Sequence, residues 1–171
     1  MTLIETVDDA RHVTPPEGLD LAFATQTTLS VDDTAEIISV LQFRFPNISG
    51  PRGEDICYAT TNRQKAVKDI ADAVDLMLVI GAENSSNSKR LVEVARLAGA
   101  KEAFLIADKD AIDWARVDGA NHIGLSAGAS APETLVEDVV AALRQRYQID
   151  VSEHGKIRET VNFKLPAILA S

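Results

Sequence analysis

The sequence is poor in cysteine, in aromatic residues and in positive charge, and each shortage excludes a class of protein. A single cysteine, Cys57, excludes a framework of disulfides within the chain. Aromatic residues make up 5% and hydrophobic residues 46%, so aliphatic side chains must pack the core. The net charge of −9, with basic residues scattered along the chain, argues against binding to nucleic acid or to an anionic membrane.

Long apolar segments are also missing. The longest strongly apolar run, residues 76–80, is far too short to span a bilayer. The first 25 residues contain carboxylates such as Glu5 and Asp9, and they lack the apolar segment of a signal peptide. We therefore expect a cytoplasmic protein in a reducing environment, with no membrane partner.

Short apolar segments alternate with longer stretches of helical periodicity. The apolar segments predict strands at residues 21–25, 76–80, 103–107 and 122–125. The helical pattern predicts helices at about residues 31–45, 61–74, 86–97 and 132–147. Repeated strand–helix units with apolar strands indicate an α/β fold, in which a parallel sheet has helices on both faces.

Small polar residues cluster where the predicted strands end and the helices begin, at residues 25–28, 60–62, 84–88 and 126–130. In open parallel sheets, ligands bind beyond the carboxyl ends of the strands. Helix N-termini and hydroxyl groups bind phosphate, so the four clusters indicate a shared anion site. The alternative is that these residues only cap their helices, because Ser, Thr and Asn are the preferred N-caps.

Cys57 stands just before the cluster at residues 60–62. A thiolate at a helix start is stabilised by the helix dipole, which favours a nucleophile or a metal ligand. A lone cysteine is equally often a small buried hydrophobic residue. The fingerprints of dinucleotide-binding and P-loop proteins are missing from the sequence.

Several segments carry a resemblance to a known family. They are residues 25–34 (TQTTLSVDDT), 55–64 (DICYATTNRQ), 84–88 (NSSNS), 127–132 (AGASAP) and 161–166 (VNFKLP). In this order they closely resemble the C-terminal half of the LytB (IspH) family, the 4-hydroxy-3-methylbut-2-enyl diphosphate reductases. The resemblance covers nearly all of the chain.

The resemblance implies a family fold of three similar α/β lobes, of which this chain supplies one complete lobe and part of another. Residues 1–50 would form a leader and the end of the second lobe. Residues 51–150 would form the third lobe, and residues 151–171 a C-terminal tail with a short strand at 161–166.

The family removes the hydroxyl group of its substrate with two electrons and two protons, in the last step of the non-mevalonate isoprenoid pathway. The products are isopentenyl and dimethylallyl diphosphate. The resemblance implies a 4Fe–4S cluster held by three cysteines, with Cys57 as the third, and a ferredoxin or flavodoxin as electron donor. It makes Thr27 the catalytic threonine near the substrate hydroxyl, with Thr28 beside it. The residues implied to bind the diphosphate are Ser85, Ser86, Asn87 and Ser130.

The family's N-terminal half has no counterpart here, and with it go two cluster cysteines, the pocket histidines and the glutamate of the proton relay. A single thiolate cannot hold a 4Fe–4S cluster, which normally needs three or four protein ligands. We therefore expect the chain to be inactive without a separate N-terminal half. The alternatives are a diphosphate-binding α/β module without redox activity, and a non-functional fragment whose exposed apolar surface promotes association.

Overall fold

The computed structural model describes residues 1–51 and 56–155. Its centre is a parallel sheet in the order β2-β1-β3, formed by β1 (Leu76–Ile80), β2 (Glu102–Ile106) and β3 (Ile123–Ala127). Every residue of β1 is buried, as a central strand made only of aliphatic residues and methionine requires. The predicted α/β fold with a parallel sheet is confirmed.

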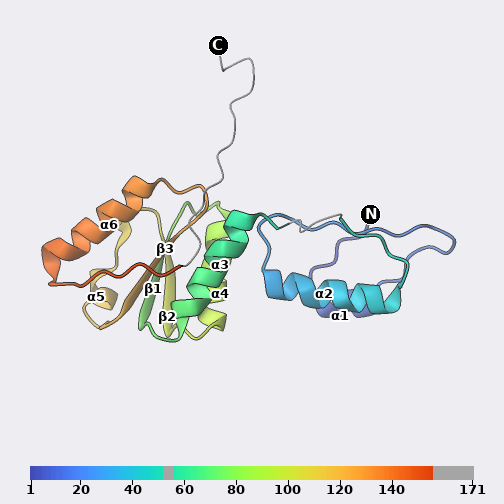
Figure 1. Cartoon of the computed structure of the whole chain (residues 1–171), viewed down its shortest axis with the longest axis horizontal. Helices are drawn as coiled ribbons and strands as arrows, with labels where there is room; N and C mark the ends of the chain where they lie inside the picture. Colours follow the sequence, from blue (N-terminus) through green and yellow to red (C-terminus); the bar gives the residue numbers. More distant parts are fainter. Residues whose placement is uncertain (52–55, 156–171) are drawn as a thin grey trace, which may run out of the picture.

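Helices cover both faces of the sheet (Figure 1). On one face lie α3 (Tyr58–Ala71) and α4 (Ser86–Leu97), packed on Met77 and Val79 of β1. On the other lie α5 (Trp114–Val117) and α6 (Glu133–Arg146), packed on the alternate residues of β1, with the 3-10 turn η1 (Lys109–Ala111) beside α6. Side chains of a strand alternate between the two faces, so β1 supplies both halves of the core.

Two predicted elements differ in the structure. Residues 21–25 form no strand, only an isolated parallel bridge between Ala22 and Ser49, because the described residues bring no further strand beside them. α3 begins at Tyr58 instead of near residue 61, because the carbonyl of Cys57 already accepts from the Thr60 and Thr61 N–H groups. The predicted strand at 161–166 lies outside the described residues.

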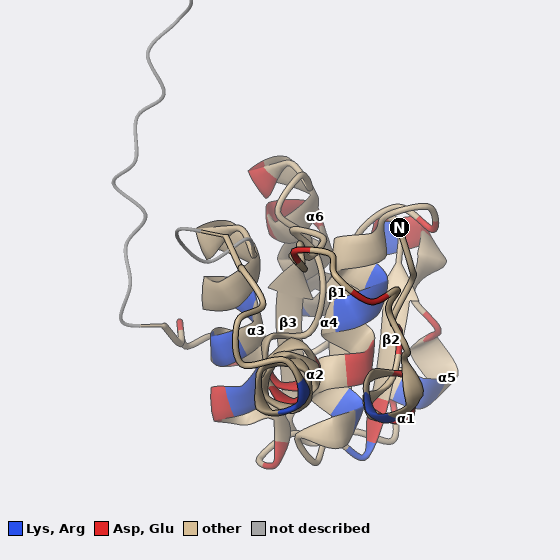
Figure 2. Cartoon of the chain, turned by 90° about the vertical axis from the view of Figure 1, so that its right-hand side faces the viewer, with Lys and Arg blue, Asp and Glu red and all other residues tan. Residues whose placement is uncertain are grey.

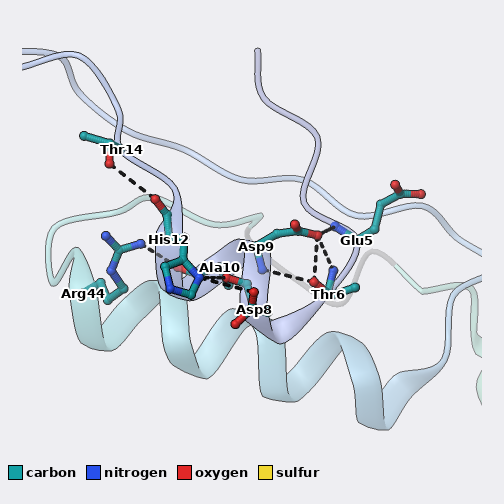
Figure 3. A network of polar contacts seen from close by, with 8 residues as sticks. All are labelled: Glu5, Thr6, Asp8, Asp9, Ala10, His12, Thr14 and Arg44. Atoms are coloured by element: carbon teal, nitrogen blue, oxygen red, sulfur yellow. Dashed lines mark hydrogen bonds and ion pairs between the residues drawn. The ribbon is translucent and has the colours of Figure 1, made fainter.

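Residues 1–50, predicted to hold a leader and the end of the second lobe, begin with the helix α1 (Val7–His12), which the sequence pattern did not indicate. A capping box begins it: the Thr6 hydroxyl accepts from the Asp9 N–H at 3.1 Å, and the Asp9 carboxylate accepts from the Thr6 N–H at 2.9 Å (Figure 3). Hydrogen bonds from the Thr6 hydroxyl and from the Glu5 and Thr6 backbone lower the pKa of Asp9. Arg44 donates to the Ala10 carbonyl at 2.6 Å and so joins α1 to α2 (Val31–Arg44).

A buried glutamine fixes the loop before α2 to α3. Gln64 is 1% exposed; its Nε2 donates to the Leu29 carbonyl at 2.8 Å, and its Oε1 accepts from the Val31 N–H at 3.1 Å. An ion pair between Lys68 of α3 and Asp32 of α2, at 2.5 Å, lies nearby on the same two helices. The loop that carries Thr27 and Thr28 is therefore held against the sheet lobe by polar contacts.

Among residues 1–51 and 56–155, no helix has both the length and the apolar character needed to cross a bilayer. Figure 2, which looks at the chain from the side of α1 and α2, shows Lys and Arg interspersed with Asp and Glu. This distribution agrees with the scattered basic residues of the sequence.

A single carboxylate joins the amino ends of the three strands. Asp75 directly precedes β1; it accepts from Lys101 Nζ at 2.5 Å and from the backbone N–H groups of Asn121 and His122 at 3.0 and 3.1 Å. Lys101 and Glu102 stand at the start of β2, and His122 directly precedes β3. The hydrogen bond from Lys101, followed by those from the two backbone groups, lowers the pKa of Asp75 to about 2.

We expect Asp75 to make the stability of the fold depend on pH in the acid range. Its folded-state pKa lies below the ordinary aspartate value of about 3.9, so the ionised group stabilises the fold above about pH 4. This stabilisation is lost as the pH falls toward 2. Asp75→Asn should lower the melting temperature near neutral pH, and the deficit should shrink between about pH 4 and 2 in circular dichroism melts. Asp69→Asn, on the exposed side of α3, is the control; a deficit independent of pH would contradict the assignment.

Replacing Gln64 by Leu should destabilise the fold by about 1–3 kcal/mol, because the Leu29 carbonyl and the Val31 N–H both lose their partner. Urea unfolding followed by circular dichroism measures the change. Gln42→Leu, on the exposed side of α2, is the matched control and should change stability by less than about 0.5 kcal/mol. Equal effects of the two substitutions would show that Gln64 does not hold the loop.

Candidate functional site

The carboxyl ends of the three strands form one edge of the sheet, and the loops that follow them meet there. The Gly81 N–H donates to the Ile106 carbonyl at 2.9 Å, and the Gly128 N–H donates to the Ile80 carbonyl at 2.8 Å. Residues 81–85 then lead into α4, and residues 128–132 lead into α6. The starts of both helices therefore lie at the same edge of the sheet.

Asn87, in the first turn of α4, is buried without hydrogen-bond partners. Its side chain is 7% exposed, and neither Nδ2 nor Oδ1 has a partner among the described residues. A buried polar group without a partner costs about 1–3 kcal/mol and is rare in folded proteins. Asn87 thus retains both a donor and an acceptor at the start of a helix, where a bound anion would use the donor.

Ser85 is the N-cap of α4. Its hydroxyl oxygen accepts from the Ser88 N–H at 3.2 Å and from the Ser88 hydroxyl at 2.9 Å. These two bonds occupy the acceptor positions of the oxygen, so the remaining capacity of Ser85 is to donate its own O–H. Ser86 follows directly, and its side chain is exposed.

Two glycines allow the strand ends to approach Ser88. A Cβ atom on Gly81 or on Gly128 would overlap the Ser88 hydroxyl oxygen. The same position on Gly128 lies 3.7 Å from Nδ2 of Asn87. The loop after β3 therefore passes beside Asn87, and Ser130 stands two residues further along it with an exposed side chain.

Cys57 and Thr27 lie together at the start of α3. The Cys57 N–H donates to the Thr27 carbonyl at 3.2 Å, although the two residues are far apart in the sequence. Cys57 is the N-cap of α3 and is exposed, so its interpretation as a buried core cysteine is wrong. Thr27 is exposed and Thr28 is half-buried. An exposed thiol at a helix start is accessible to a ligand or a metal ion.

The residues around Asn87 and the pair Cys57 and Thr27 lie on the same face of the sheet, toward the carboxyl ends of its strands. α3 and α4 pack on the same face. Residues 72–75 connect the end of α3 to the start of β1. Because so short a connection reverses the direction of the chain, the first residue of α3 lies near the carboxyl end of β1. Cys57 and Asn87 therefore lie on the same face of the sheet and toward the same edge.

The alternative that the polar clusters only cap helices holds for some of their members. Ser30 and Ser85 are N-caps whose hydroxyls accept from the backbone of α2 and α4. Thr60 lies in the first turn of α3, where it is buried and does not serve as the N-cap. Asn87 is not a cap, and α6 begins at the N-cap Pro132 without a side-chain cap, so capping does not explain Asn87 or Ser130.

Sequence reasoning missed the part that Gly81, Ser88 and Gly128 play in bringing the strand ends together. The available signal was a glycine one residue after a buried strand, which marks a close backbone approach. β3 extends to Ala127, further than the predicted end at residue 125, and this places Gly128 directly at the sheet edge.

The residues of this chain do not by themselves fit a 4Fe–4S cluster. Cys57 is the only cysteine in the sequence. Within residues 1–51 and 56–155, no group of three or more His, Cys, Asp or Glu side chains is arranged to hold a metal ion. A cluster of this kind needs three or four protein ligands, so the single cysteine of this chain cannot hold one by itself.

Comparison with known proteins gives consistent results. The family model described as LytB protein matches residues 1–144. The 4-hydroxy-3-methylbut-2-enyl diphosphate reductase of Hyphomonas neptunium is 58% identical over 170 residues, which are 99% of this chain and 54% of that protein. The reductase of the same name from Gluconobacter oxydans is 53% identical and aligns over 99% of this chain and 51% of its own length.

A solved structure agrees with this relationship. The E-1-hydroxy-2-methyl-but-2-enyl-4-diphosphate reductase of Plasmodium falciparum superposes with a TM-score of 0.88 at 33% identity, over 98% of this chain and 53% of that one. The chain spans about half the length of the curated relatives it matches. Because the family model covers residues 1–144 of 171, and relatives above 50% identity align over almost the whole chain, the chain belongs to the LytB protein family.

Proposed function

We propose that this chain is the diphosphate-binding portion of a 4-hydroxy-3-methylbut-2-enyl diphosphate reductase. The observation that carries the proposal is the buried amide of Asn87, which has no protein partner among the described residues and lies at the start of α4. A phosphate oxygen at this point would accept from Nδ2 of Asn87 and would interact favourably with the helix dipole.

The side chains around Asn87 suit a diphosphate. Ser85 has its O–H left to donate, because both of its acceptor positions are used by Ser88. Ser86 is exposed in the first turn of α4, and Ser130 is exposed on the loop that passes Asn87. We infer that these four residues bind the diphosphate mainly through neutral donors and a helix terminus.

The reactive end of the substrate would lie toward Cys57 and Thr27. We assign Thr27 to the substrate hydroxyl, with Thr28 as its neighbour, and Cys57 as one of three cysteine ligands of a 4Fe–4S cluster. In the whole enzyme the hydroxyl would leave as water after uptake of two electrons and two protons, which gives isopentenyl and dimethylallyl diphosphate. A ferredoxin or flavodoxin in the cytoplasm would supply the electrons.

The complete reaction needs the half of the family fold that has no counterpart in this chain. One cysteine cannot hold the cluster. The second candidate function, a diphosphate-binding module without redox chemistry, is favoured by the same observation, because the Asn87 site needs no cluster to bind an anion. The two functions differ in whether a complementing half restores a cluster.

Replacing Asn87 by Leu should separate ligand binding from stability. The unpaired amide stabilises nothing in the free chain, so the melting temperature of Asn87→Leu should equal or exceed that of the unmodified chain. Binding of isopentenyl diphosphate, measured by calorimetry, should weaken about tenfold or more, since the loss of a hydrogen bond to a charged group costs about 1.5–3 kcal/mol.

Asn121→Leu is the matched control, because Asn121 is exposed at the opposite edge of the sheet. It should leave the affinity for the diphosphate unchanged. Equal affinity of Asn87→Leu and the unmodified chain would contradict the proposed site, as would an unmodified chain that does not bind the diphosphate.

Complementation should test the role of Cys57. The chain is mixed with the first half of the Hyphomonas neptunium reductase and reconstituted anaerobically with iron and sulfide. We expect a visible charge-transfer absorption band and reductase activity from the mixture. Cys57→Ala should remove both, because one of three cluster ligands is lost, while binding of isopentenyl diphosphate persists.

The intact Hyphomonas neptunium reductase is the positive control. A mixture that shows neither absorption nor activity, while the intact enzyme shows both, would contradict the reductase assignment. If that same mixture still binds the diphosphate through Asn87, the second candidate function is the correct one.

A further inference from the structure

Ser88, in the first turn of α4, carries a hydroxyl group that is closed off from solvent. The residue is 1% exposed, so it does not reach a ligand that binds at the helix start. The backbone of Gly81 and that of Gly128 pack against its hydroxyl oxygen, since a Cβ atom on either glycine would overlap it. A buried hydroxyl group of this kind needs its hydrogen-bond acceptor within the protein.

The hydroxyl oxygen of Ser85 is the acceptor that the described residues offer to Ser88, at an O···O distance of 2.9 Å. Either hydroxyl can donate across this distance, and burial decides between the two directions. If Ser85 donated, the proton of Ser88 would be buried without an acceptor, which is costly. If Ser88 donates, the proton of Ser85 stays free on a residue that is only half-buried. Ser88 is therefore the donor.

This direction of donation also sets the direction of the Ser85 proton. The Ser85 oxygen accepts from the Ser88 N–H at 3.2 Å as well, so both of its acceptor positions face the first turn of α4. The remaining O–H of Ser85 points away from that turn, outward from the start of the helix. An oxygen that accepts hydrogen bonds becomes a stronger donor, because the bonds of a chain polarise one another.

We propose that Ser88 is a positioning residue of the diphosphate site, which acts on the ligand only through Ser85. It turns the Ser85 O–H outward before the ligand arrives, and a donor that is already oriented loses less entropy on binding. This inference rests on the proposed function, because it concerns the donor that Ser85 offers to the same diphosphate. The alternative is that Ser88 only packs the start of α4 against the two glycines.

A double-mutant cycle separates the two roles, with binding of isopentenyl diphosphate to the full chain measured by calorimetry. Ser88→Ala should weaken binding about threefold or more, because the Ser85 O–H can then turn toward other acceptors. In the Ser85→Ala background, Ser88→Ala should cause no further loss, since the group through which it acts is gone. Ser130→Ala is the control background. Ser88 donates to Ser85 and not to Ser130, so Ser88→Ala should again weaken binding about threefold.

Melting temperatures test the direction of the hydrogen bond without a ligand. In the otherwise unmodified chain, Ser88→Ala should lower the melting temperature by about 1–4 °C, because a buried hydrogen bond is lost. In the Ser85→Ala background the same change should raise it, because it removes a buried hydroxyl group that has lost its acceptor. A serine that only fills space would lower the melting temperature in both backgrounds.

Three results would overturn the proposal: an equal loss of affinity from Ser88→Ala with and without the Ser85 hydroxyl, a higher melting temperature of Ser88→Ala in the otherwise unmodified chain, or a lower one in both backgrounds. Each of them leaves the diphosphate site intact, because Asn87→Leu tests that site separately. An unmodified chain that does not bind the diphosphate would overturn the proposed function and the role of Ser88 in it. The melting temperatures would still show which serine donates.

Discussion

The buried amide of Gln64 is the contact on which the arrangement of the site depends. The section before Cys57 has no core of its own, so apolar packing cannot fix its position. Gln64 holds it instead, by donating to the Leu29 carbonyl and accepting from the Val31 N–H, and Arg90 of α4 adds an ion pair with Asp33 of α2 at 3.7 Å. Hydrogen bonds require defined distances and angles. The loop of Thr27 is therefore held in one position beside the start of α3.

The site itself combines tight packing with a buried polar side chain that has no hydrogen-bond partner among the described residues. Gly81 and Gly128 contact Ser88 from two neighbouring strand ends, so the first turn of α4 lies close against the ends of the strands. Asn87 is buried by this packing although its amide has no partner among the described residues. The free protein thus keeps a destabilising feature, which the proposed diphosphate would offset by accepting from Nδ2 of Asn87.

The fold could be predicted from the sequence where the signals are local. The apolar run of β1 and the serine caps of α2 and α4 gave nearly correct bounds, because each depends on neighbouring residues alone. The strand at 21–25 was wrong, since a strand exists only where another segment pairs with it. The helix α1 was missed, although Thr6 and Asp9 form the capping box that starts it. The burial of Asn87 could not be predicted, because Gly128, which passes beside it, is distant in the sequence. The roles of the site residues, and the division of the chain into residues 1–50, 51–150 and 151–171, stay predictions.

Asp75 has a consequence for how this lobe can diverge over evolution. One carboxylate aligns the amino ends of all three strands, at the edge opposite to Asn87 and Cys57. The hydrogen bonds that join the strand starts thus lie at the edge opposite to the proposed ligand site. Substitutions in the loops at the other edge, apart from Gly81 and Gly128, leave this hydrogen-bonded arrangement of the amino ends intact. Such a scaffold can acquire new substrates while its architecture is inherited unchanged.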